Sequence, residues 1–193
     1  MKSHTPSLLR EYTGWVRDRD ACERARATCR DTAAQLSDAR VPTEALARFV
    51  EPGKRLLIFP RAATMAPEGA VWRLGTLLLG ESGELWAAGK VTRAAERGRV
   101  GYQSVSREDR KDLAAAALKG GYPEGTVVNF DAHALTLTPE SVANLGAEDP
   151  IGFDEGEVRV RWRAGAPLSG ALTLAQYLSE RAGLLIDPPL GAT

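Results

Sequence analysis

The chain has 193 residues, of which 44% are hydrophobic and 26% charged, a composition typical of a soluble globular protein that buries its own core. Its 25 basic residues balance its 25 acidic ones, which argues against general binding to nucleic acid or to a membrane surface. No apolar run approaches the roughly 20 residues of a membrane span, and the first residues lack a secretory signal, so we expect a cytoplasmic protein without membrane contact.

A long helix is predicted to begin at Thr5, which can cap it, and to continue to about Ser37. A helix of that length would be roughly 45–50 Å long. It should therefore either break near residues 17–20 or pair with another chain, which makes Tyr12 and Trp15 candidate interface residues for a homo-oligomer or a protein partner. Residues 42–50 predict a second helix, so we expect a helical region over 1–51 and an α+β domain over 52–193.

The rest of the chain predicts strands joined by short links, with helices between some of them. The predicted strands are residues 55–59, 70–79, 84–91, 100–105, 125–130 and 157–163, and the predicted helices are 106–119, one from Thr138 and one from Thr173. The strand over 157–163 alternates apolar and charged residues, which indicates one solvated face. This pattern favours an α+β fold in which helices pack on one face of an antiparallel sheet, preceded by an N-terminal helical arm.

Cys22 and Cys29 lie seven residues apart, on one helix face but two turns from each other. This spacing is too wide for both thiolates to bind one metal ion, so core packing or a dimer seam is the expected role. With two histidines and no close acidic cluster around His133, the sequence predicts neither a metal site nor a cofactor.

Asp131 and His133 are the first candidate for chemistry, because on a strand both side chains would point to the same face. His133 could act as a general base that Asp131 orients. Residues two apart on a strand are about 6.5–7 Å apart at their Cα atoms, which is poor geometry for that role. The alternative is an ordinary polar end of a strand.

A stripe of arginines on the 157–163 strand is the second candidate. Arg159, Arg161 and Arg163 could clamp a phosphate or a carboxylate. The alternative is the solvated face of a sheet, with Val158, Val160 and Trp162 facing inward. Nucleic-acid binding by this stripe is less expected, since aromatic residues do not interleave with the arginines on that face.

Several catalytic motifs are incomplete. Leu79–Gly83 reads LGESG, which resembles the glycine-glutamate-serine motif of cysteine-type glutamine amidohydrolases, but no cysteine or histidine–glutamate element follows it. No serine has a lysine three residues later, as serine-type glutaminases require, and Walker, G-x-S-x-G and G-x-G-x-x-G motifs are absent from the sequence.

The last two thirds of the chain resemble a group of small, uncharacterised actinobacterial proteins. The resemblance rests on Trp72–Gly75, on the alanine-rich helix that ends at Gly120-Gly121, on Arg161-Trp162, and on the tail with Tyr177, Glu180-Arg181 and Pro188-Pro189. Some members carry a glutaminase label, which the motifs of this chain do not support. The resemblance therefore implies a family and assigns no catalytic or binding residue.

These observations favour a non-enzymatic protein-interaction or ligand-sensing module. The alternative is a small-molecule hydrolase, such as an amide hydrolase, that uses His133 as base and the arginine stripe as its anion site. A third possibility is nucleic-acid binding by the arginine face, which would show a steep dependence on salt.

Overall fold

The computed structural model describes the backbone of residues 5–54, 60–98 and 105–189 and the side chains of residues 18–53, 62–98 and 106–189. The strand predicted over 55–59 and nearly all of the one predicted over 100–105 lie outside the described residues. The chain forms two compact units. Unit 1 comprises Met1–Val41, Leu74–Ala87 and Ala134–Thr193, and unit 2 comprises Pro42–Arg73 and Ala88–His133. This division differs from the predicted regions 1–51 and 52–193.

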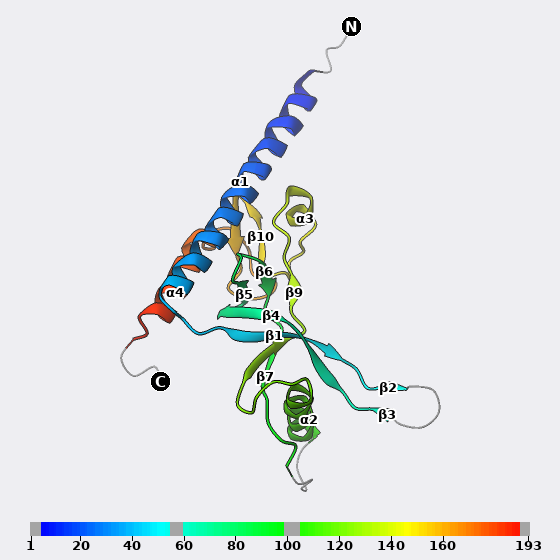
Figure 1. Cartoon of the computed structure of the whole chain (residues 1–193). Coiled ribbons are helices and arrows are strands. Elements are labelled where there is room, and N and C mark those ends of the chain that lie inside the picture. The colour runs from blue at the N-terminus through cyan, green and yellow to red at the C-terminus, as the bar shows by residue number, and fades with distance from the viewer. Residues whose placement is uncertain (1–4, 55–59, 99–104, 190–193) are drawn as a thin grey trace. The chain divides into compact units, whose positions relative to one another are not determined.

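Unit 1 is built around helix α1 (Thr5–Asp38), a single helix of 34 residues that does not break near residues 17–20 (Figure 1). Its buried residues recur at helical spacing and form one stripe: Ala21, Cys22, Ala25, Cys29, Thr32, Ala33 and Leu36. The helix ends in a Schellman motif, in which the amide of Val41 donates to the Leu36 carbonyl and that of Arg40 to the Ser37 carbonyl. The side chains of Tyr12 and Trp15 lie outside the described residues, so their interface role stays a prediction.

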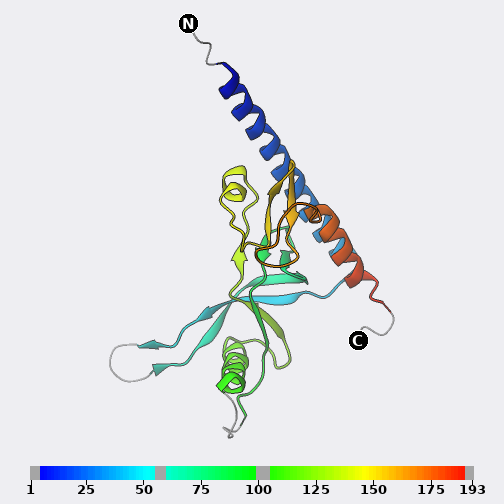
Figure 2. The same ribbon diagram turned by 180° about the vertical axis from the view of Figure 1, so that it is seen from behind.

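The stripe of α1 packs against helix α4 (Leu174–Ile186) and against strand β11 (Glu157–Val160). Figure 2 shows α4 beside α1, with β11 and its partner β10 (Ile151–Asp154) next to both helices. The predicted start of α4 is confirmed, since Thr173 and Gln176 form a capping box. The short helix α3 (Pro139–Ala143) is confirmed as well, with Thr138 as its cap.

A hairpin of β5 (Leu77–Gly80) and β6 (Leu85–Ala87) completes the regular elements of unit 1. The predicted strand over 70–79 is wrong in its extent, because a turn at Gly75 and Thr76 divides it into β4 (Thr64–Leu74) and β5. Gly75 has φ +65°, a left-handed conformation that glycine adopts without strain. The two-residue strand β9 (His133–Ala134) lies where the two units divide.

Unit 2 contains a mixed sheet in the order β7–β8–β1–β4. Its strands are β1 (Glu44–Val50), β7 (Lys90–Arg93), β8 (Val127–Phe130) and the greater part of β4. The β1–β4 and β7–β8 pairs are antiparallel, whereas β1 and β8 run parallel. A short pair of β2 (Gly53–Lys54) and β3 (Pro60–Arg61) extends from the β1–β4 hairpin.

The second predicted helix, over residues 42–50, is wrong, because these residues form β1. Hydrogen bonding to β4 on one side and β8 on the other satisfies the backbone of this segment. Pairing on both edges outweighs the moderate helix propensity of Glu44, Ala45 and Leu46, since propensity is a weak preference that tertiary contacts override.

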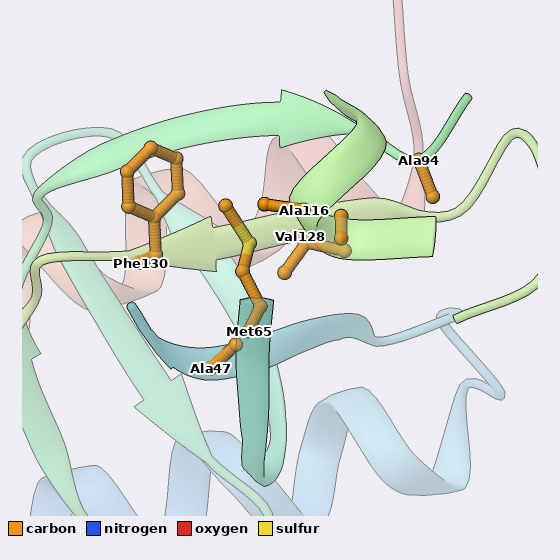
Figure 3. Packing of buried hydrophobic residues seen from close by; sticks show 7 residues of the cluster. Ala47, Met65, Ala94, Ala116, Val128 and Phe130 are labelled. Atoms are coloured by element: carbon orange, nitrogen blue, oxygen red, sulfur yellow. The ribbon is translucent and has the colours of Figure 1, made fainter. Parts of the chain in front are cut away.

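One face of the unit 2 sheet is covered by helix α2 (Val105–Lys119), which confirms the helix predicted over 106–119. Figure 3 shows the core between them, where Met65, Val128 and Phe130 meet the alanines of α2. The whole cluster is Ala47, Met65, Ala94, Ala116, Ala117, Val128 and Phe130. Burying a side chain the size of Met65 or Phe130 contributes roughly 1.5–3 kcal/mol. The architecture is thus α+β, as the sequence predicts, and no helix in the described part of the chain is long and apolar enough to cross a membrane.

Candidate functional site

A pocket of about 340 Å³ lies within unit 1, beside α4. We call it the Trp162 pocket. Its walls come from the turn after β4, the end of β11, the loop before α4, and α4 itself; the lining residues are Gly75, Thr76, Val160, Arg161, Trp162, Gly170, Ala171, Leu172, Tyr177 and Arg181. This volume falls at the lower end of the roughly 300–1,000 Å³ that is usual for small-molecule sites.

Tyr177 forms the fixed wall of the pocket. Its hydroxyl donates to the carbonyl of Leu74 at 3.0 Å and accepts from the amide of Thr76 at 3.1 Å. A side chain at position 75 would overlap this hydroxyl, which is a second reason for glycine there. The hydroxyl of Tyr177 is therefore committed to holding the turn, and the Tyr177 ring is what this residue offers to a ligand.

Trp162 is the most exposed of the large hydrophobic side chains among the described residues, at 69% of its surface. The expectation that it faces inward with Val158 and Val160 is wrong, because β11 ends at Val160 and the alternation ends with it. The guanidinium of Arg163 lies 4.5 Å from the centre of the Trp162 ring. Such cation–π stacking covers one face of the indole and leaves the other to solvent.

Arg161 is buried beneath the pocket, with 9% of its surface exposed. Its three guanidinium nitrogens donate to the backbone carbonyls of Asp149, Ala166 and Gly146. No carboxylate forms an ion pair with it among the residues that the structure describes. The positive charge of Arg161 is therefore solvated by backbone dipoles and is not held in an ion pair with a carboxylate of the described residues.

Arg181 is exposed on α4, with its guanidinium carbon 5.3 Å from the centre of the Tyr177 ring. The described part of the chain provides no ion pair for Arg181 or for Arg163. Arg159 differs from both, because it pairs with Asp154 and Glu155 and donates to the carbonyl of Ala171. The predicted stripe therefore divides: Arg159 is part of the hairpin structure, whereas Arg161 lines the pocket and Arg163 stacks on Trp162.

The prediction that this stripe is a solvated face is thus wrong for Arg159 and Arg161. The side chain of Arg159 is 15% exposed and Arg161 is buried. Both donate to more than one backbone carbonyl, a role that arginine fills well because it carries five N–H groups.

The other candidate pair, Asp131 and His133, does not form a catalytic dyad. Asp131 occupies a left-handed turn at φ 53°, and its carboxylate lies 2.9 Å from the ammonium of Lys90. His133 is exposed. The geometry corresponds to the alternative interpretation, a polar end of a strand in which the aspartate is bound by a lysine.

Both cysteines are buried free thiols on the packed side of α1. Burial raises the pKa of Cys29 to about 12, although the nearby Arg30 opposes the shift. Burial also raises the pKa of Cys22, against the influence of Arg26. Thiols with raised pKa values are poor nucleophiles, and the predicted role in the core is confirmed. No group of three potential metal ligands occurs among the described residues.

A second hollow, of about 380 Å³, lies in unit 1 between α1 and β6 and is lined in part by Arg26, Arg30 and Trp86. It is less suited to binding an anion, because Arg26 donates to the carbonyl of Leu137 and Glu84 contributes a negative charge to the same lining.

Comparison with protein-family models, with curated proteins and with solved structures finds no match to this chain. The resemblance to the actinobacterial group therefore stays a prediction. Two residues of the Trp162 pocket, Tyr177 and Arg181, received no role from the sequence. Their spacing of four on a predicted helix, with an aromatic ring below a cation, is the signal that could have identified them.

Proposed function

We propose that this protein is a non-enzymatic ligand-binding module whose Trp162 pocket takes a small molecule. The observation that carries the proposal is the position of Trp162: its indole is 69% exposed at a pocket whose arginines have no carboxylate partner among the described residues.

An indole in water and a buried guanidinium that no described carboxylate pairs with both cost free energy that a ligand can recover. A bound ligand would remove apolar surface of Trp162 from water, and an anionic ligand would place a negative charge near Arg161. The pocket also has a mixed lining, in which Leu172 and the Tyr177 ring lie beside two arginines. A few polar groups within an apolar wall are the usual composition of a small-molecule site.

A hydrolytic function has weaker support from the geometry. A general base must be within hydrogen-bonding reach of the substrate and a nucleophile must be activated by a neighbour. His133 is exposed, Asp131 is neutralised by Lys90, and the hydroxyl of Tyr177 is engaged by the β4–β5 turn. The proposal therefore assigns binding to this chain and no bond cleavage.

A thermal-shift screen of the purified full-length chain tests the proposal. The panel holds metals, nucleotides, amino acids, sugar phosphates and organic acids, and a ligand at a hundredfold excess over its Kd adds about 2.7 kcal/mol of stability. We expect a hit that the Trp162→Ala variant loses and the matched Trp86→Ala variant, at the second hollow, retains.

Two results would contradict the proposal. One is a panel without a hit that depends on Trp162. The other is turnover of a hit compound that the wild type shows and His133→Ala lacks, since that would restore the hydrolase alternative.

A further inference from the structure

We propose that the ligand of the Trp162 pocket is a small aromatic monocarboxylate, whose carboxylate binds Arg181 and whose ring stacks on Trp162. This inference rests on the proposed function, because it names the ligand class for the same pocket. The argument comes from which donors the pocket has already committed and which remain.

Five of the ten residues that line the pocket donate their backbone amides within the protein. The amide of Val160 donates to Leu172, that of Arg161 to Pro150, that of Ala171 to Leu168, that of Tyr177 to Thr173, and that of Thr76 to the Tyr177 hydroxyl. Amides at the N-terminus of α4 are also used, since Thr173 and Gln176 form a capping box in which each side chain accepts from the other residue's backbone amide. Phosphate sites in proteins depend on several free amides, at a helix N-terminus or in a loop, so this pocket is poorly equipped for a phosphate.

The guanidinium of Arg181 is the exposed cationic group of the lining, and it has no ion pair among the residues that the structure describes. Nε, Nη1 and Nη2 of Arg161 each donate to a backbone carbonyl and the residue is 9% exposed, so Arg161 contributes mainly its positive charge to the pocket. A guanidinium presents two parallel N–H groups, which match the two oxygens of one carboxylate. One available fork beside one buried positive charge predicts a single carboxylate.

The remainder of the ligand must satisfy the apolar wall. Arg163 covers one face of the Trp162 ring, and the opposite face is available for stacking. Leu172, which is 37% exposed, lies in the same lining and would lose contact with water when a ligand enters. Ring systems stack on indole in offset or edge-to-face arrangements that contribute beyond their buried area, so a flat aromatic ring fits better than a saturated one.

Isothermal titration calorimetry on the full-length chain tests the inference with four probes of similar size. Phenylacetate is the expected ligand. Phenylacetamide lacks the negative charge, cyclohexylacetate lacks the flat ring, and phenyl phosphate has a phosphate in place of the carboxylate. We expect phenylacetate to bind most tightly. The Kd values of the other three should be about tenfold higher, because each loses either the charge-assisted hydrogen-bond pair or the ring stacking.

Variants assign the binding to residues. Arg181→Gln should weaken phenylacetate by about tenfold and leave phenylacetamide unchanged, because only the charged group contacts Arg181. Trp162→Ala should weaken both compounds. Arg107→Gln, an exposed arginine on α2 in unit 2, is the matched control and should change neither. Circular dichroism establishes that each variant is folded.

The outcomes separate the two proposals. Phenylacetamide or cyclohexylacetate binding as tightly as phenylacetate would overturn the inference, as would tighter binding of phenyl phosphate or no detectable binding of phenylacetate. In each of these cases, a thermal-shift hit of another class that requires Trp162 would still support the proposed function. If neither experiment finds a ligand that depends on Trp162, both proposals fail.

Discussion

The phenolic oxygen of Tyr177 on α4 lies 3.0 Å from the carbonyl oxygen of Leu74, the residue before the turn that separates β4 from β5. This bond joins two segments that are 103 residues apart in the sequence. The same hydroxyl accepts from the amide of Thr76, so one side chain satisfies both sides of the turn. The position of Tyr177, and with it one wall of the pocket, is set by these contacts.

Tyr177→Phe should therefore destabilise the protein by about 1–3 kcal/mol, the cost of leaving buried backbone groups without partners. Urea denaturation followed by circular dichroism measures the change. Tyr122→Phe is the matched control, because it loses a single longer bond, of 3.3 Å, to the carbonyl of Leu46 in unit 2 and should cost less. Equal losses for the two variants would contradict the role given to Tyr177.

Asn129 holds a polar cluster on the face of the unit 2 sheet opposite α2. It is completely buried, accepts from Nε of Arg73 at 2.9 Å and donates to the carboxylate of Glu44 at 2.7 Å. Asn129→Leu should cost about 2–3 kcal/mol in the free energy of unfolding, since two partly buried charged groups lose partners.

A double-mutant cycle with Arg73→Met checks this cluster. Arg73 already has one buried nitrogen, Nη2, without a hydrogen-bond partner. Asn129→Leu would leave Nε without its partner as well, and Arg73→Met would remove both unsatisfied nitrogens. We expect the double variant to be more stable than the sum of the single effects. Strict additivity would show that Asn129 and Arg73 contribute independently.

Cys29 should make the stability of the protein depend on alkaline pH. Burial raises the pKa of Cys29 from 9.0 to about 12, so between these values the unfolded chain releases a proton that the folded protein retains. The contribution of this thiol to stability is complete below pH 9 and falls as the pH rises towards 12. Urea midpoints at increasing pH should decline less steeply in Cys29→Ala than in the wild type, and parallel curves would exclude the effect.

Arg40 occupies a position that favours glycine. It has φ 55° and follows the last turn of α1 in the Schellman motif, where a left-handed conformation strains most side chains. Arg40→Gly should raise the free energy of unfolding by about 1 kcal/mol, whereas the control Arg40→Ala should give no gain. Thermal unfolding of the three proteins measures the difference, and a lower melting temperature for Arg40→Gly would contradict it.

Features that depend on local chemistry could be predicted from the sequence. Thr138 and Thr173 identified their helices because a capping side chain acts within its own turn. The helix predicted over residues 42–50 is wrong because the strand found there depends on a partner more than 80 positions away: Ala45 pairs with Val128. No window around Glu44 contains that information.

The candidate site was only partly predictable for the same reason. Arg161 was identified by its charge, but its burial depends on the carbonyls of residues 146, 149 and 166. Trp162 was assigned to the interior by alternation, which holds only while the strand continues. Arg181 belongs to the site only because the fold brings α4, with Tyr177 and Arg181, against the turn at Gly75.

The contact between α1 and α4 has a consequence for how the chain is made. A ribosome synthesises α1 first, and α4, which covers part of its buried stripe, comes more than 130 residues later. Throughout that interval, during which the segments of unit 2 are synthesised, the part of the stripe that α4 contacts is not covered by α4. Nascent chains arrested before Leu174 should therefore bind chaperones that recognise apolar helices and release them once α4 has emerged.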